Sequence, residues 1–192
     1  MKRIFTTILA VIFLVSLTAC SGNEKVKFEK IQPGKVNKTN LYSNDSIGLS
    51  IKFPKEWVLL PKKDYPSSLQ ESKNMKPLAV FTDKSIKDTD VQANYVFQIL
   101  TIKSTISAED QLYGIKAQAE MLTYLNMKTG EVTNYKLNGK TFYSLETQIE
   151  GQGTTTTLVY DAGDYVIQFI GFINTKSKAA PIENIINSIK IK

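Results

Sequence analysis

The residues that could carry chemistry are few, because this 192-residue chain has no histidine and a single cysteine, Cys20. Nucleophilic catalysis by serine–histidine or cysteine–histidine pairs is therefore excluded. The usual zinc sites need histidine or cysteine ligands, so we expect none of those either. A serine–lysine pair stays formally possible, but no residue is singled out for it. We expect no catalytic residues, no metal, no cofactor and no enzymatic activity.

Carboxylates offer two weak alternatives to that expectation. Asp88 and Asp90 share a polar loop, but an EF-hand would need glycine and glutamate where Ala93 and Ile99 stand. Glu146 and Glu150 fall on one face of an expected strand, about 13 Å apart along it. Glycosidase carboxyl pairs are about 5–9.5 Å apart. An enzyme using other groups would need two of them in a cleft with mutually shifted pKa values.

Aromatic and hydroxyl side chains suggest two possible ligand surfaces. Trp57, with Tyr42 and Tyr65, could form an aromatic platform, although tryptophan more often anchors a core. Thr154–Thr157 could bind sugars, although the β propensity of threonine explains this run equally well. The sequence therefore leaves any ligand-binding residues unknown. Gly151 and Gly153 belong to a hairpin turn and not to a phosphate loop, because no helix follows them.

The first twenty residues form a leader. Lys2 and Arg3 precede an apolar run of 14 residues, Ile4–Leu17, which is shorter than the roughly 20 residues of a membrane-spanning helix. This layout is typical of a secretory signal peptide. A plain secretory signal would leave an unpaired cysteine in an exported protein.

The end of this leader, Leu17-Thr18-Ala19-Cys20, resembles the lipobox of bacterial lipoproteins. The resemblance implies that residues 1–19 are a lipoprotein signal peptide and that the thiol of Cys20 carries a diacylglyceryl anchor. The two acyl chains of such an anchor suit stable membrane attachment. We therefore expect a lipid-anchored protein on the extracytoplasmic face of the cell membrane.

The basic residues argue against nucleic acid as a partner. Arg3 is the only arginine, and it leaves with the leader, as does Lys2, so the formal net charge falls from +6 to about +4. Guanidinium groups are the usual means of bidentate phosphate capture, and the mature chain has none. The remaining charge favours solubility or a weak attraction to anionic surfaces.

The mature chain is expected to be one domain on a tether. About 170 residues remain after cleavage, enough for a single core. Residues 20–40 are polar, lysine-rich and without periodicity, and we interpret them as the lipidated N-terminus and a flexible tether. Residues 41–192 form the domain.

Alternating and apolar runs predict strands at 49–53, 58–60, 78–81, 95–102, 132–137, 140–150, 154–160 and 165–173. Asn138-Gly139 is a strong hairpin signal. Residues 61–77 read as a loop with a short helix near 67–72. The strands 95–102 and 165–173 are apolar on both faces except at Gln98, Thr101 and Gln168, so we expect them inside the sheet, covered above and below.

Two helices are predicted. Ser107 caps the first, with Asp110 three residues later, and Leu112, Ile115, Ala119, Leu122 and Leu125 form its buried stripe up to Gly130. Pro181 begins the second helix, and its buried face is Ile182, Ile185, Ile186 and Ile189. We expect an α+β fold with an antiparallel sheet and these helices on opposite faces.

The residues from Tyr42 to Trp57, with Gly48 leading a strand into Pro54-Lys55-Glu56-Trp57, resemble the opening of PsbP-like domains. The strand 165–173 and the helix ending Ile185-Ile186-Asn187-Ser188-Ile189 resemble the end of such domains. The resemblance covers roughly 42–192 and implies the Mog1/PsbP-like α/β/α sandwich. Members of this family are mostly accessory and binding proteins, and no partner-binding motif of theirs is present here.

Together these features predict a membrane-anchored, non-catalytic binding module for a protein or cell-envelope partner, held to the membrane through Cys20. The alternative is a small-ligand-binding lipoprotein that serves a transporter or a sensor. That alternative predicts a pocket with a few convergent polar groups.

Overall fold

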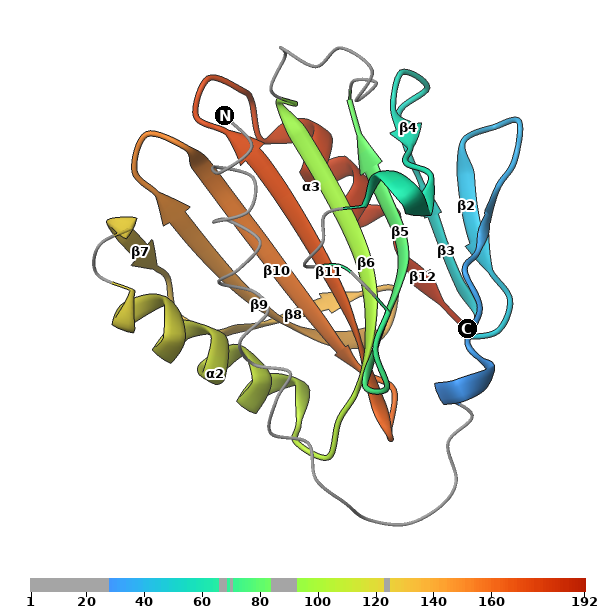
Figure 1. The fold of residues 1–192 in the computed structure, drawn as a ribbon, viewed down its shortest axis with the longest axis horizontal. Coiled ribbons are helices and arrows are strands. Elements are labelled where there is room, and N and C mark those ends of the chain that lie inside the picture. Colours follow the sequence, from blue (N-terminus) through green and yellow to red (C-terminus); the bar gives the residue numbers. More distant parts are fainter. Residues whose placement is uncertain (1–27, 66–68, 70, 84–92, 123–124) are drawn as a thin grey trace.

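The computed structural model describes residues 28–65, 69, 71–83, 93–122 and 125–192 (Figure 1). Within these ranges the chain forms a large antiparallel sheet, a small antiparallel sheet and two α-helices, α2 and α3. No described helix combines the length and apolar character needed to cross a membrane.

The large sheet has the strand order β4-β5-β6-β11-β10-β9-β7, and β8 also pairs with β9. Every neighbouring pair is antiparallel, and β6 and β11 lie inside the sheet as predicted. Asn138 and Gly139, both with positive φ, form the tight turn between β8 and β9. The strands are β4 (Val58–Leu59), β5 (Met75–Thr82), β6 (Tyr95–Lys103), β7 (Met127–Thr129), β8 (Thr133–Leu137), β9 (Lys140–Ile149), β10 (Gly153–Asp161) and β11 (Tyr165–Asn174).

The small sheet shows that the domain begins earlier than predicted. Its strands are β1 (Lys35–Val36), β2 (Leu41–Asn44), β3 (Leu49–Lys52) and β12 (Lys190–Ile191), in the order β1-β2-β3-β12. The 3₁₀-helix η2 (Phe28–Lys30) precedes them, and Phe28 and Ile31 are buried in the core. The expectation of a tether up to residue 40 is therefore wrong from Phe28 onward, because apolar side chains in a lysine-rich segment find partners far along the chain.

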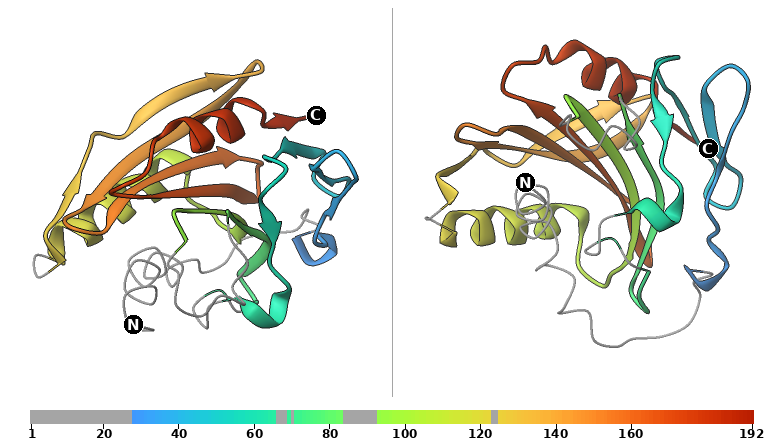
Figure 2. Two further views of the ribbon diagram at one scale, coloured as in Figure 1. Left: turned by 90° about the horizontal axis from the view of Figure 1, so that it is seen from above. Right: turned by 45° about the horizontal axis from the view of Figure 1, so that its top comes forward.

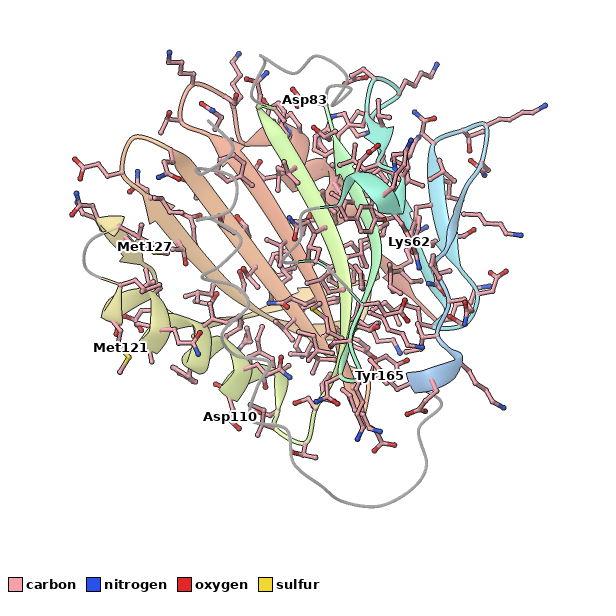
Figure 3. All side chains as sticks on the ribbon, viewed as in Figure 1. Lys62, Asp83, Asp110, Met121, Met127 and Tyr165 are labelled. Atoms are coloured by element: carbon pink, nitrogen blue, oxygen red, sulfur yellow. The ribbon has the colours of Figure 1, made fainter. Side chains whose placement is uncertain are left out.

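Helix α2 (Ala108–Met121) begins as predicted and ends earlier (Figure 3). The Ser107 hydroxyl accepts a hydrogen bond from the Asp110 amide at 3.0 Å. The helix stops at Met121 and not at Gly130, because residues 127–129 pair as β7 with β9. Gly130 instead donates its amide to the Glu146 carbonyl at 2.8 Å.

Helix α3 (Ala180–Asn187) has Pro181 as its second residue and buries Ile182, Ile185 and Ile186. Ile189 is also buried, but it lies beyond the helix, between α3 and β12. A second 3₁₀-helix in the described part of the chain is η3 (Lys62–Asp64). The short helix predicted near 67–72 falls largely outside the described residues.

The two faces of the large sheet are covered by different elements (Figure 2). Leu158 of β10 packs in the cluster that contains the isoleucines of α3, and its neighbour Val159 packs with Leu112 and Ile115 of α2. Successive strand residues point to opposite faces, so α2 and α3 lie against opposite faces. The α+β class and the central antiparallel sheet are confirmed.

Candidate functional site

Several of the predicted site residues lie outside the described part of the chain. Cys20 and its leader are among them, and so are Asp88 and Asp90. Lipidation of Cys20 therefore stays a prediction. Within the described residues, no group of three or more Asp, Glu, His or Cys side chains is arranged to hold a metal ion.

The aromatic residues considered as a ligand platform belong to the core. Trp57 is buried and stacks on Tyr95 with ring centroids 5.8 Å apart. Tyr42 is fully buried, and its hydroxyl oxygen accepts the Gly34 amide at 3.0 Å. Burial raises the pKa of Tyr65 to about 12. These rings anchor strands and loops to the core and present no exposed platform.

The other motifs are structural as well. Glu146 is exposed on β9, and Glu150 lies in the turn after it. Gly151 has a positive φ of 70°, and Gln152 donates its amide to the Ile149 carbonyl at 3.0 Å, so this segment is a hairpin turn. A Cβ on Gly153 would lie 2.1 Å from the Ile173 carbonyl oxygen, which explains the second glycine.

The pKa shifts of the described groups follow from burial and from local hydrogen bonds. Burial raises the pKa of the phenols of Tyr42 and Tyr165. A hydrogen bond to Glu131 raises the pKa of Lys116. A backbone hydrogen bond, together with Lys103, holds the pKa of Glu29 below its usual value. None of these groups is among the residues that line the cleft described below.

A different set of residues forms the strongest candidate site. Five buried polar side chains, which we call the polar row, lie on the α2 face of four adjacent strands. Thr155 of β10 stands directly opposite Thr147 of β9, and Thr157 is two residues along β10. Directly opposite residues have Cβ atoms about 4.5–5.5 Å apart and diagonal neighbours about 7–8 Å. The row consists of Thr147, Thr155, Thr157, Gln168 and Gln98.

The strand register continues this row across the centre of the sheet. Gln168 of β11 lies opposite Val159, so Thr157 is its diagonal neighbour. Gln98 of β6 lies opposite Ile170, two residues beyond Gln168. The five side chains are 1–7 % exposed. Residues up to 70 positions apart in the sequence therefore share one narrow buried band.

The polar row is under-satisfied. The side-chain oxygens Gln98 Oε1, Gln168 Oε1 and Thr155 Oγ1 are buried without a hydrogen-bond partner among the described residues. The same holds for Gln118 Oε1 on α2, the helix that packs on β9 and β10. Each buried, unsatisfied polar group costs about 1–3 kcal/mol of stability. Such groups are uncommon in native cores.

The surroundings of the polar row are apolar and uncharged. On one side lies the cluster of Leu100, Ile170 and Phe172, and on the other lies the α2 cluster with Leu145 and Val159. The row therefore separates two apolar clusters on one sheet face. Sequence reasoning noted Gln98 and Gln168 as polar exceptions, but it could not show that register brings them together.

A second surface is a shallow cleft on the opposite face, between α3 and the hairpin of β8 and β9. Its volume is about 260 Å³. At its edge, the Tyr135 hydroxyl donates to Asn187 Oδ1 at 2.7 Å, joining the hairpin to α3. Tyr135 is 37 % exposed. The cleft, which we call the α3 cleft, is lined by Tyr135, Ser144, Thr156, Leu158, Glu183, Ile186 and Asn187.

Comparison with solved structures identifies the architecture. The solution structure of cyanobacterial PsbP (CyanoP) from Synechocystis sp. PCC 6803 matches 92 % of this chain and 99 % of its own, with a TM-score of 0.54 and 14 % identity. The chain has the PsbP fold. The predicted PsbP-like domain is confirmed at that level, and at 14 % identity the likeness concerns the fold alone.

Two further solved structures are similar over part of the PsbP-like domain. LpqN of Mycobacterium tuberculosis, a protein involved in cell envelope biogenesis, matches 75 % of this chain and 83 % of its own, with 15 % identity and a TM-score of 0.48. A protein from Bacteroides thetaiotaomicron matches 76 % of this chain and 45 % of its own, with 14 % identity and a TM-score of 0.41. Neither protein-family models nor curated protein sequences gave a match.

Proposed function

We propose that this chain is a lipid-anchored, extracytoplasmic binding module without catalytic activity. Its PsbP-like domain, arranged as an α/β/α sandwich, would dock a protein or cell-envelope partner at the outer surface of the cell membrane. The anchor would be a diacylglyceryl group on Cys20, added after removal of residues 1–19. No nucleic acid takes part.

The observation that carries this proposal is the spacing between the lipobox and the folded domain. Cys20 ends the lipobox-like sequence, and Phe28 is already packed at 1 % exposure. The eight residues from Cys20 to Phe28 can span at most about 29 Å even when fully extended. An anchor on Cys20 would therefore hold the domain directly against the membrane surface, where its partners would be membrane proteins or envelope polymers.

The anchor is tested by mass spectrometry of the full chain expressed in a bacterial host. We expect a protein that begins at Cys20 and carries the mass of a diacylglyceryl group. The Cys20→Ala variant should keep its leader and lose that mass. A full-length chain with a bare thiol on Cys20, or protein found only in the cytosol, would overturn the proposal.

The α3 cleft supports the docking of a partner. It combines an exposed aromatic ring, two hydroxyl groups and the carboxylate of Glu183 over an apolar floor of Leu158 and Ile186. Crosslinking in native membranes followed by co-purification of the anchored chain should recover one partner. Tyr135→Ala together with Glu183→Lys should abolish this recovery, whereas Tyr113→Ala on the outer side of α2 should not.

The polar row favours a second candidate function, the binding of a small ligand that is then passed to a transporter or a sensor. Ligand sites place a few polar groups among apolar side chains, and the polar row has that composition. The two candidates are compatible, because the polar row and the α3 cleft lie on opposite faces of the sheet.

A further inference from the structure

The α3 cleft is bridged at one end and carries a carboxylate one helical turn away from the bridge. The bridge is the hydrogen bond from the Tyr135 hydroxyl to Asn187, which joins β8 to α3. In Figure 2, the hairpin of β8 and β9 lies on the same side of the large sheet as α3. Glu183 lies four residues before Asn187 on the helix, so the two side chains share one helix face. Both of them line the cleft.

A second carboxylate stands level with the first. Thr156, which lines the cleft, pairs with Glu146 of β9 on one side and with Gly171 of β11 on the other. Directly paired residues share a face of the sheet, so Glu146 is on the face that holds the cleft. Ile182, the residue before Glu183, packs on Gly171. Glu183 and Glu146 therefore lie on opposite sides of Thr156.

Neither carboxylate has a cationic partner in the described part of the chain. The ion pairs formed there involve other glutamates. Lys128 of β7 faces the same side of the sheet, where it pairs with Gln148, and it forms no ion pair with Glu146. The chain as a whole has a formal net charge of +6, so an unpaired acidic site runs against its overall balance. Such a site is electrostatically complementary to a cationic partner.

The size of the cleft favours a side chain of a protein over a separate small molecule. Its volume of about 260 Å³ lies below the roughly 300–1,000 Å³ of small-molecule sites. Leu158 and Ile186 form an apolar floor, and they are 2 % and 8 % exposed. Protein interfaces are commonly anchored by an apolar side chain seated in a pocket of this kind and surrounded by a polar rim.

We propose that the α3 cleft docks a basic peptide segment of a protein partner, a segment in which aliphatic side chains are flanked by lysine or arginine. An aliphatic side chain packs on Leu158 and Ile186, and the flanking cations pair with Glu146 and Glu183. This inference rests on the proposed function, docking of a partner at the α3 cleft, and names the chemistry of that partner.

The test uses the full chain in nanodiscs of phosphatidylcholine, a lipid without net charge that does not itself attract basic peptides. The probe is a rhodamine-labelled peptide with the core Lys-Leu-Leu-Lys between glycine–serine flanks, and fluorescence anisotropy measures its binding. Comparison peptides replace both lysines with glutamine, both lysines with glutamate, or both leucines with serine. We expect saturable binding of the lysine–leucine peptide, weakened by added salt, and at least tenfold weaker binding of each comparison peptide.

Variants of the two carboxylates locate the binding. Glu146→Gln combined with Glu183→Gln should weaken binding of the lysine–leucine peptide at least tenfold without lowering the melting temperature, because both side chains are exposed. The matched control, Glu56→Gln combined with Glu109→Gln, removes two carboxylates elsewhere, before β4 and on α2, and should bind as the parent does. Glu146→Lys combined with Glu183→Lys should instead bind the glutamate peptide, a gain that misfolding cannot produce.

The proposal is overturned if the lysine–leucine peptide shows no saturable binding, or if the matched control binds as weakly as the variant of Glu146 and Glu183. Binding of an N-acetylglucosamine tetramer that Tyr135→Ala removes, without peptide binding, would assign the cleft to a glycan and also overturn it.

The proposed function fails on separate results. A bare Cys20 with intact peptide binding would remove the anchor and leave this inference in place. A crosslinked partner that depends on the α3 cleft but is not displaced by the lysine–leucine peptide would keep the docking function and remove this inference.

Discussion

Gly171 of β11 lies directly beneath Ile182 of α3, and a Cβ built on this glycine would be 2.6 Å from the Ile182 Cγ2 atom. The absence of a side chain at Gly171 therefore allows α3 to approach the sheet closely. This contact sets how closely α3 approaches the sheet, and α3 forms one wall of the α3 cleft. The size of the residue at position 171 therefore affects the shape of a candidate docking surface.

We expect Gly171→Ala to destabilise the protein by about 1–3 kcal/mol, because the added methyl group overpacks the α3 contact. Urea unfolding followed by circular dichroism measures this change. Gly130→Ala is the matched control, since its Cβ would meet nothing nearer than 3.6 Å. Equal stability of the two variants would mean that α3 shifts without cost.

Phe28→Ala tests where the folded domain begins. The Phe28 ring is buried, lies 6.4 Å from the Tyr165 ring and has the Lys76 ammonium 5.3 Å above it. Removing a buried phenylalanine costs about 3–5 kcal/mol, whereas a tether residue would cost nothing. Val36→Ala on exposed β1 should change the free energy of unfolding by less than about 0.5 kcal/mol. A Phe28→Ala chain as stable as the parent would restore the tether interpretation.

Ser107→Ala tests the start of α2. The Ser107 hydroxyl accepts the Asp110 amide and donates to Asp110 Oδ2 at 2.7 Å. We expect a loss of about 1 kcal/mol in the free energy of unfolding, and only a few tenths for Ser107→Gly. Thermal unfolding of the three proteins measures both differences, and the reverse order of the two variants would contradict this capping role.

The stability of the protein at alkaline pH should depend on Tyr65. Burial raises the pKa of its phenol to about 12, whereas the phenol of an unfolded chain ionises near pH 10. The folded state thus keeps its proton longer, so this contribution is fully present below pH 10 and is lost as the pH rises through about 12.

Tyr65→Phe should therefore flatten the decline of stability between pH 10 and pH 12. Absorbance at 295 nm follows phenolate formation in the parent, and urea unfolding at each pH gives the free energy. Measurements at pH 8, where all phenols are neutral, provide the baseline for both proteins. Identical slopes for parent and variant would show that Tyr65 ionises like an exposed tyrosine.

Local patterns were sufficient to predict most of the elements. The alternation at Leu49–Phe53, the Asn138-Gly139 turn and the capping pair Ser107 and Asp110 depend on residues close together in the sequence, and the structure confirms each of them. The exposed fraction of a side chain also follows from such patterns, which is why the buried stripes of α2 and α3 were largely correct.

Element boundaries that depend on distant partners were not predictable in this way. Residues 28–40 looked like a tether because they are polar and without periodicity, but Phe28 and Ile31 pack in the core with strands far along the chain. Helix α2 ends at Met121 because the following segment pairs with β9, a partner about twenty residues later. Composition and periodicity carry no information about such pairings.

The sequence by itself determined the absence of histidine chemistry and the α+β class, and it predicts a leader before Cys20, because each depends on residue type or local spacing. Only the tertiary structure decided that Gln98, Thr155 and Gln168 share one buried band. Strand register is set by cooperative pairing across the whole sheet, so the neighbours of a residue on a face are fixed only when every strand has found its partner.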